Sequence, residues 1–280
     1  MASLKGKVVL VDFWTYSCIN CIRTLPHMQA YWEKYKNQPF TLIGVHTPEF
    51  VFEKSEANVA HAIKQYGLTY PVAQDNDFGT WNAFANRYWP AKYLIDAEGY
   101  IRYTHFGEGG YEETDKAIAS LLGEIGANAP DMPMPEEKMQ VQKEVTPETY
   151  LGARSWPSLG NAQGEPTDQI VIYSAPTSME LHKYYLDGGW QLVDGEYQLL
   201  QSDRGEIRMK FLGGEMNLVL GTHAGKAISA DVFIDGKKTK TITVDHHDLY
   251  NLFTGEYGEH EMRLLIHGKG LEGYAFTFGA

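Results

Sequence analysis

The chain has 280 residues, with 24 lysines and arginines against 36 aspartates and glutamates, and a formal net charge of −12. Neither half is net basic, which argues against nucleic acid or an anionic membrane surface as the main partner. No apolar run approaches the roughly 20 residues that span a bilayer, and two cysteines are too few for a structural disulfide framework.

The chain opens without the features of a secretory signal. Such a signal needs a basic segment, an apolar core and a small-residue cleavage site, whereas Met1–Lys7 leads directly into the apolar segment Val8–Val11. The sequence therefore predicts either a cytoplasmic protein or a soluble piece whose export signal or membrane part has been removed. The residues alone leave both alternatives open.

Residues 1–126 alternate between strand-like and helix-like segments. Val8–Phe13 is apolar apart from one aspartate, which is typical of a strand buried on both faces, and helical spacing follows over Ile22–Lys36. The later segments, which include a hairpin signal before the last helix, are Phe40–Val45, Glu53–Tyr66, Asp77–Tyr88, Lys92–Asp96, Tyr100–Phe106 and Glu112–Ile125. This order predicts an α/β layer fold.

Residues 127–147 have a different composition, in which four prolines separate acidic and amide side chains, so a partly extended linker is predicted. Beyond it, over 148–280, the helical period disappears. Short strand-like runs separated by glycine-rich turns take its place: Gln169–Tyr173, Glu196–Gln201, Ile207–Leu212, Met216–Leu220, Ala230–Ile234, Lys240–Val244, Glu261–Ile266 and Tyr274–Phe278. The pattern predicts an all-β sandwich or jelly roll.

The segment with the clearest chemistry is the pair Cys18 and Cys21, placed where a buried strand passes into a helix. A helix N-terminus stabilises a thiolate through its unpaired N–H groups and its dipole. Two intervening residues allow the thiols to close a disulfide across one helical turn. Cys18, nearer the surface, is predicted to attack, and Cys21 to resolve the mixed disulfide.

Two other interpretations of the cysteine pair are weaker. Zinc needs four ligands and the sequence has no second cysteine pair, while His27 falls on another face of the predicted helix. Two inert buried cysteines are the remaining alternative. We therefore predict no metal site and no cofactor other than the redox-active Cys18–Cys21 disulfide.

With these residues the sequence resembles the thioredoxin superfamily. Asp12 lies six residues before Cys18, where thioredoxins keep a buried acid, and Pro26 lies where they kink the active-site helix. The resemblance implies that Asp12 exchanges a proton with Cys21. It also implies that Trp89-Pro90 forms the cis-proline segment and that Trp14, Trp89 and Pro90 bind the substrate chain.

A narrower resemblance rests on the spacing between Cys18 and Pro90 and on the amino-acid sequence of two segments. The 72 residues from Cys18 to Pro90 leave room for an extra helix and strand, which marks the TlpA-like group of cytochrome-c biogenesis. The segments Trp14–Pro26 and Ile43–Phe50 look like the soluble part of DipZ-type thiol:disulfide interchange proteins. That resemblance implies a preceding membrane electron donor of the DsbD/CcdA type, a following domain similar to a carbohydrate-binding module, and a periplasmic or other extracytoplasmic location.

These features predict a thiol:disulfide oxidoreductase that acts on disulfide-containing protein substrates. The uncharged pair Ile19-Asn20 between the cysteines favours a reductant, because strong oxidants stabilise their thiolate heavily. His46 and Glu49 are candidates for tuning the site. A thiol peroxidase is a rival, although no threonine and arginine pair beside Cys18 supports it.

The second domain offers weaker signals. Trp156, Trp190 and Tyr250, together with Tyr257, are candidates for glycan binding, and they are also the residue types that fill a small sandwich core. Asp245–Asp248 reads like a metal cluster, but adjacent strand residues point to opposite faces, so a solvated turn is favoured. The alternative function is therefore a glycan- or protein-binding module with the first domain as its scaffold.

Overall fold

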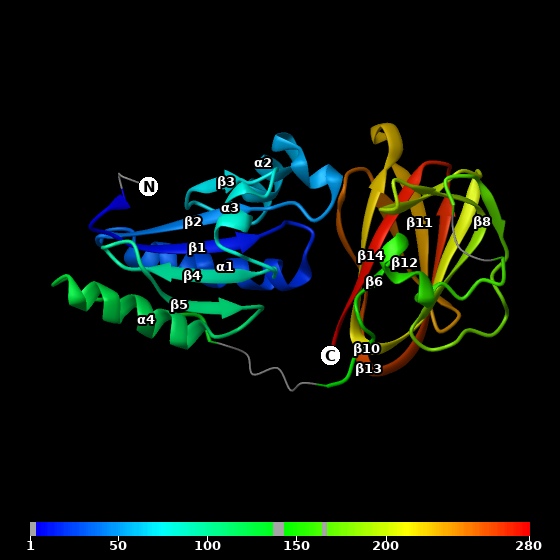
Figure 1. Cartoon of the computed structure of the whole chain (residues 1–280). Coiled ribbons are helices and arrows are strands. Elements are labelled where there is room, and N and C mark those ends of the chain that lie inside the picture. Colours follow the sequence, from blue (N-terminus) through cyan, green and yellow to red (C-terminus); the bar gives the residue numbers. More distant parts are fainter. Residues whose placement is uncertain (1–3, 137–142, 164–166) are drawn as a thin grey trace. The chain divides into compact units, whose positions relative to one another are not determined.

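The structure is a computed structural model, which describes residues 4–136, 143–163 and 167–280 (Figure 1). The chain divides into two compact units, Met1–Met139 and Gln140–Ala280, and each unit has an apolar core of its own. Across the described ranges, no helix is both long enough and apolar enough to cross a bilayer.

The first unit is built on a five-stranded sheet with the order β3-β2-β1-β4-β5 (Figure 1). Strand β1 pairs in parallel with β2 and antiparallel with β4. The strands are β1 (Val8–Trp14), β2 (Phe40–His46), β3 (Val72–Gln74), β4 (Ala91–Ile95) and β5 (Ile101–Phe106). The predicted α/β fold is confirmed as a thioredoxin fold, and α2 and β3 form the extra helix and strand.

Helices cover both faces of this sheet. They are α1 (Ile19–Tyr35), η2 (Val51–Lys54), α2 (Glu56–Gln65), α3 (Gly79–Ala83) and α4 (Tyr111–Glu124). Side chains of β1 alternate between two cores because successive strand residues point to opposite faces. Val8 and Leu10 join the core that α1, α2 and α4 cover, whereas Val9 and Phe13 join the core that holds Trp81 of α3.

Two predicted helices are shorter than expected. The prediction of one helix over Glu53–Tyr66 is wrong because Ser55 has an extended backbone and caps α2 by accepting the N–H of Asn58 at 3.4 Å. Glu53 therefore lies on η2, outside the helix. The helix predicted over Asp77–Tyr88 is only α3, bounded by Phe78 and Ala85, which both have positive φ.

The second unit is mostly β. Its hydrogen-bonded path runs β12-β11-β13-β10-β14-β9-β8-β7, with β6 paired to β14. The elements are β6 (Thr149–Tyr150), η3 (Ala153–Ser158), β7 (Val171–Tyr173), β8 (Lys183–Val193), β9 (Tyr197–Leu200), β10 (Arg204–Thr222), η4 (His223–Gly225), β11 (Ile228–Ile234), β12 (Lys237–Val244), β13 (Asp248–His267) and β14 (Leu271–Gly279).

The core of this unit lies between strands that are not hydrogen-bonded neighbours. Tyr184 and Leu186 of β8 share one apolar cluster with Met209 of β10 and Leu264 of β13, and β8 packs against β10 although the two are separated in the path. The sheet therefore folds over its own apolar face, as a sandwich does.

Three strand predictions need correction. The glycine-rich turn expected between Ile207–Leu212 and Met216–Leu220 is an irregularity inside the single strand β10, where the register with β13 shifts after Gly213. Strand β13 is likewise much longer than the predicted Glu261–Ile266. No strand is predicted over Lys183–Val193, where Gly188 at φ +98° interrupts the alternating pattern of β8.

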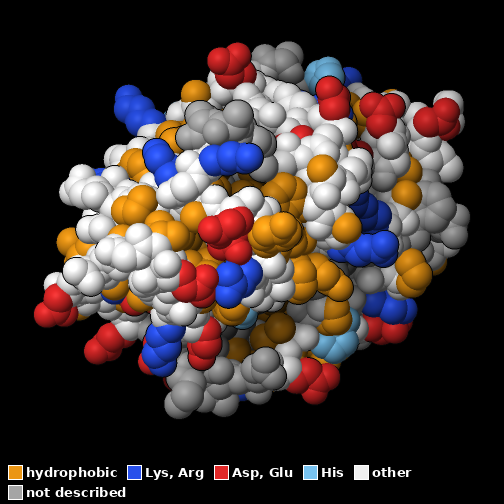
Figure 2. All heavy atoms as spheres, turned by 60° about the vertical axis from the view of Figure 1, so that its left-hand side comes forward, with side chains coloured by type: hydrophobic (Ala, Val, Ile, Leu, Met, Phe, Trp, Pro, Cys, Tyr) orange, Lys and Arg blue, Asp and Glu red, His pale blue; other side chains and the backbone are white. Residues whose placement is uncertain are grey.

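The surface carries both signs of charge. On the face shown in Figure 2, acidic and basic side chains are interspersed among hydrophobic ones, with no broad basic area.

Candidate active site

The two cysteines lie at the beginning of α1. Cys18 is the residue before the first helical turn and is half-buried, whereas Cys21 is 0% exposed. Both are free thiols in this structure. The first turn of α1 contains no acidic side chain, so the positive end of the helix is available to a thiolate at Cys18.

Cys21 lies in a site that disfavours its charged form. Burial, followed by the hydrogen bond with Cys18, raises the pKa of the Cys21 thiol well above its usual range. The negative charge of Asp12 acts in the same direction, and a hydrogen bond with the backbone of Thr15 opposes it. Cys21 therefore needs a base before it can attack.

Asp12 is the buried acid of β1. It pairs with Lys92 of β4 and with Gly44 of β2 in the strand register and is 0% exposed. Within the part of the chain that the structure describes, neither carboxylate oxygen has a hydrogen-bond partner. Burial raises the pKa of Asp12 to about 7, and the charge of Lys92 opposes that shift.

Lys92 is a buried cation whose place in the site was not predicted from the sequence. Its side chain is 0% exposed, and its Nζ donates to the carbonyl of Gly109 at 2.5 Å and lies 4.5 Å from the ring centroid of Tyr111. Since Asp12 and Lys92 are register partners on one face of the sheet, the lysine brings a positive charge to the buried acid.

The Trp89–Pro90 peptide bond is cis, which is the geometry that the resemblance implies. Trp89 is held in place by its indole N–H, which donates to the carbonyl of Thr47 at 3.0 Å, and by Trp81, whose ring centroid lies 4.2 Å away. Trp14 differs from the expectation. Its ring is 0% exposed and meets His46 edge-on, so it lies behind the site and offers no surface to a substrate.

The two candidates for tuning the site differ in position. His46 is fully buried, and burial lowers its pKa to about 4, so it is neutral near pH 7. Its Nε2 lies 3.4 Å from the hydroxyl of Thr15, directly before the cysteine segment. Glu49 is half-buried, and its contribution is its backbone N–H, which donates to Glu53 at 2.6 Å.

Glu53 is a site residue that was not predicted from the sequence. The carboxylate is 0% exposed and accepts hydrogen bonds from the hydroxyls of Thr15 and Ser17 at 2.5 and 2.6 Å. The helix predicted over Glu53–Tyr66 hides this role. The signal that could have revealed it is Ser55, whose type favours a helix N-cap and therefore places Glu53 in the preceding segment.

The predicted glycan-binding residues whose side chains the structure describes differ in their exposure. The structure contradicts the glycan-binding role considered for Trp190, because its ring is 0% exposed within the core and its N–H donates to the carbonyl of Asp187. Tyr250 is half-buried against the same core. Tyr257 is 36% exposed. The side chain of Trp156 lies outside the described residues.

The acidic and histidine segment at 245–248 does not converge on one point. His246 contacts Asp245 and Asp248, whereas His247 points to Glu272, which it meets at 2.7 Å. Among the residues that the structure describes, no group of three or more histidine, cysteine, aspartate or glutamate side chains is placed to hold a metal ion.

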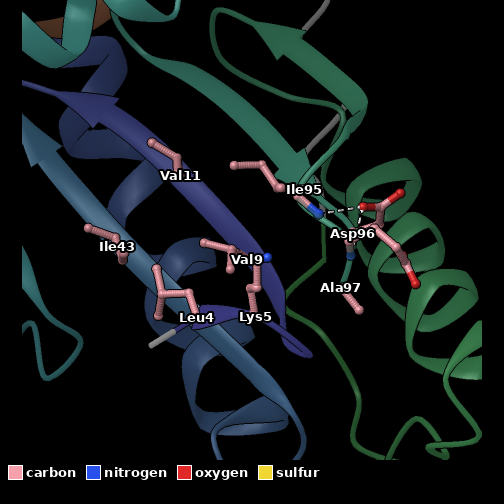
Figure 3. Close-up of a pocket in the computed structure, with 10 residues that line it drawn as sticks. Leu4, Lys5, Val9, Val11, Ile43, Ile95, Asp96 and Ala97 are labelled. Atoms are coloured by element: carbon pink, nitrogen blue, oxygen red, sulfur yellow. Dashed lines mark hydrogen bonds between the residues drawn. The ribbon is translucent and has the colours of Figure 1, made fainter. Parts of the chain in front are cut away.

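A small apolar pocket lies elsewhere in the first unit. Figure 3 shows Leu4, Val9, Val11, Ile43 and Ile95 around it, and its volume is about 210 Å³. Its lining includes neither of the cysteines and not Asp12. The pocket therefore belongs to the opposite face of β1 from the buried acid, since Val9 and Val11 alternate with Asp12 along the strand.

A thiol pair at a helix N-terminus, a buried acid on β1 and a cis Trp-Pro bond before β4 are the features that a thioredoxin-fold thiol site combines. Family models agree: residues 1–104 match the AhpC/TSA family, and residues 146–279 match the family described as a thioredoxin-like C-terminal domain. The two matches fall one on each compact unit of the chain, and the first agrees with the thioredoxin fold of the five-stranded sheet.

Among known proteins, the chain is similar to Protein DipZ of Mycobacterium bovis, with 34% identity over 285 residues. The match covers 100% of this chain and 40% of the relative, so the chain spans well under half of that protein's length. The thiol-disulfide oxidoreductase YkuV of Bacillus subtilis is 28% identical over 118 residues, covering 42% of this chain and 79% of YkuV.

The chain is also similar to a solved structure of a thiol:disulfide interchange protein from Chlorobium tepidum. The match covers 44% of this chain and 84% of the Chlorobium chain, with 26% sequence identity and a TM-score of 0.38.

Proposed function

We propose that the protein is a thiol:disulfide oxidoreductase that reduces disulfides in extracytoplasmic proteins. The observation that carries the proposal is the pairing of a half-buried Cys18 with a fully buried Cys21 in hydrogen-bond contact at the start of α1. The relative YkuV supports the reaction class, since its name is that of a thiol-disulfide oxidoreductase.

The reaction proceeds in two exchanges. The Cys18 thiolate attacks one sulfur of the substrate disulfide, and the other substrate sulfur leaves as a thiolate that takes up a proton. Cys21 then attacks the Cys18 sulfur of the mixed disulfide and releases the second substrate thiol. Two electrons pass to the substrate, and the enzyme is left with a Cys18–Cys21 disulfide that a donor must reduce again.

Asp12 acts as the base in the second exchange. Burial raises the pKa of Asp12 to about 7, so near neutral pH the carboxyl is able both to take and to return a proton. The charge of Asp12 acts on the Cys21 thiol, which has a strongly raised pKa. We therefore assign to Asp12 the proton that Cys21 must lose.

The direction toward reduction rests on the residues around Cys18. Ile19 and Asn20 add no charge between the cysteines, and α1 has no histidine in its first turn. A couple without a strongly stabilised thiolate favours the disulfide and therefore donates electrons. We propose a membrane electron-transfer domain as the upstream donor, because the resemblance to DipZ-type proteins implies one and the DipZ relative has room for it outside the part that this chain matches.

Insulin reduction with dithiothreitol tests the proposal. We expect the wild-type chain to accelerate the reaction and Cys18→Ser to abolish the acceleration, because the attacking sulfur is lost. Cys21→Ser is expected to trap a mixed disulfide with the substrate, which mass spectrometry detects, because the first exchange survives and the second does not.

The control is Ser120→Ala, which changes an exposed residue of α4 outside the motif and should reduce insulin at the wild-type rate. If Cys18→Ser and wild type reduce insulin at equal rates, the enzymatic proposal is wrong. A reduction potential close to about −270 mV supports the reductant role, whereas a value close to about −120 mV overturns it in favour of an oxidant.

A further inference from the structure

Glu53 takes no part in the exchange described above, yet its carboxylate lies at the centre of a dense set of hydrogen bonds. One oxygen, Oε1, accepts from the hydroxyl of Thr15 at 2.5 Å, the hydroxyl of Ser17 at 2.6 Å and the backbone N–H of Ser17 at 3.4 Å. The other, Oε2, accepts from the backbone N–H groups of Glu49 and Phe50 at 2.6 and 2.9 Å.

The two oxygens serve different parts of the chain. Oε1 faces residues 15–17, which link the end of β1 to Cys18. Oε2 faces residues 49–50, which link β2 to η2. The carboxylate therefore ties the segment that delivers the attacking cysteine to the segment beside it, across 36 positions of sequence between Ser17 and Glu53.

The groups that surround the Glu53 side chain require a hydrogen-bond acceptor at this position. Three backbone N–H groups can only donate, and together with the two hydroxyls they supply hydrogen atoms to both oxygens. A neutral amide at this position would turn an NH₂ group toward donors on one side. Hydrogen bonds to an ionised acceptor are also the stronger kind.

We propose that Glu53 is a positioning residue for the thiol pair: by holding Thr15 and Ser17, its carboxylate keeps Cys18 beside Cys21. This inference rests on the proposed exchange function. When residues 15–17 are held in place, the effective concentration of one thiol toward the other rises, so the Cys18–Cys21 disulfide forms more favourably.

The surroundings of Glu53 set the conditions for a test. Burial raises its pKa to about 7, and the hydrogen bonds from Ser17 and Thr15 oppose that shift. The titratable neighbours are Glu49, whose negative charge contributes to raising the pKa of Glu53, and His46, which shares the Thr15 hydroxyl from β2 and is neutral. Measurements at pH 8 therefore address the ionised carboxylate.

The experiment is the equilibrium of the full chain with reduced and oxidised glutathione at pH 8, followed by acid quenching and mass spectrometry. We expect Glu53→Gln to lower the equilibrium constant for forming the Cys18–Cys21 disulfide about tenfold, which makes the couple about 30 mV more oxidising. A residue that only supports the fold would destabilise both redox states alike and leave this constant unchanged.

Glu56→Gln is the matched control, because it removes the same charge from an exposed glutamate three positions along, and we expect its constant to equal that of wild type. Equal constants for Glu53→Gln and Glu56→Gln would overturn the inference while leaving the exchange function intact. If wild type itself forms no Cys18–Cys21 disulfide in these buffers, the exchange function fails instead.

Ser17→Ala gives an independent measurement, because it deletes one donor and leaves Glu53 in place. We expect Ser17→Ala to lower the equilibrium constant for forming the Cys18–Cys21 disulfide about threefold. In the combined Ser17→Ala/Glu53→Gln variant, we expect this constant to fall by less than the product of the two separate factors. Should Glu53→Gln fail to fold, a Ser17→Ala constant equal to that of wild type overturns the inference.

Discussion

Two carboxyl groups, Asp12 and Glu53, are fully buried around one thiol pair, and the fold satisfies them in opposite ways. Glu53 is surrounded by hydroxyl and N–H donors. Asp12 has no donor within the described residues and instead faces the buried cation Lys92. A proton moves on and off a carboxyl more freely when no fixed donors hold its charged form, which suits Asp12 to proton transfer and Glu53 to support.

The charge of Asp12 should therefore appear in the pH dependence of stability. Burial raises its pKa from 3.8 to about 7, so its contribution to stability is complete below pH about 4 and is lost as the pH rises through about 7. Asp12→Asn removes this dependence. We expect the free energy of unfolding of Asp12→Asn, relative to wild type, to increase by roughly 2–3 kcal/mol between pH 5 and pH 8.

Urea unfolding of both proteins at each pH measures this difference, and subtraction cancels the contributions of His46 and Glu53, which titrate in both. Asp77→Asn, at an exposed position, is the control and should show a constant difference from wild type. A pH-independent difference for Asp12→Asn would mean that the carboxyl is ionised throughout this range.

The residues of the site that could be predicted are those whose roles depend on local spacing. Cys18 and Cys21 follow from their place at the start of one helix, and the resemblance to thioredoxins implies the role of Asp12 from its distance in sequence to Cys18. Glu53 and Lys92 could not be found this way, because their roles come from contacts made across the sheet. Nothing in the sequence next to Lys92 indicates that its cation is buried against Tyr111.

At the scale of the element, β2 contains a glycine where the buried acid of β1 lies beside it. Gly44 pairs with Asp12 in the register. A Cβ there would lie 2.9 Å from the ring of Tyr70 and 3.0 Å from Nε1 of Trp14. Both rings are buried, so neither can move aside freely, and the absence of a side chain allows them to pack against the strand.

Gly44→Ala is expected to destabilise the protein by roughly 1–3 kcal/mol, because the added methyl group overpacks a closed core. The same substitution at Gly123 is the control. That glycine is exposed on α4, and a Cβ there meets no atom within 4 Å, so Gly123→Ala should be neutral or stabilise by up to about 1 kcal/mol. Chemical unfolding measures both, and a neutral Gly44→Ala would show that the rings repack.

The elements that the sequence predicts well are those whose apolar residues follow one regular pattern throughout, such as β1, α1 and α4. Local patterns divide β10 and shorten β13, because glycines and charged residues inside these long strands look like turns. The continuity of both strands depends on pairing with neighbours, with the register shift near Gly213 as an example. Local patterns carry no information on such pairing.

At the scale of the whole molecule, all the residues assigned to the exchange reaction belong to the first compact unit, Met1–Met139. Each unit also has its own apolar core. A domain with its own core and a complete site is expected to fold and act by itself. We therefore expect the second unit to contribute little to the rate of the exchange reaction.

A chain ending at residue 139 should retain insulin reduction within about twofold of the full chain. Circular dichroism and thermal unfolding establish that the shortened chain is folded, and Cys18→Ser in the same background gives the uncatalysed rate. A folded but inactive residue 1–139 chain would show that residues 140–280 contribute to catalysis.

The hydrogen bonds of Glu53 have a consequence for protein engineering. Transplanting only the stretch from Trp14 to Pro26 into another scaffold would carry over the sulfur atoms and leave Thr15 and Ser17 without the carboxylate that they bind in this protein. A faithful graft must therefore include the separate stretch that ends at Ser55, even though it contains no reactive group. The cysteine segment and the carboxylate that supports it therefore come from two separate pieces of chain.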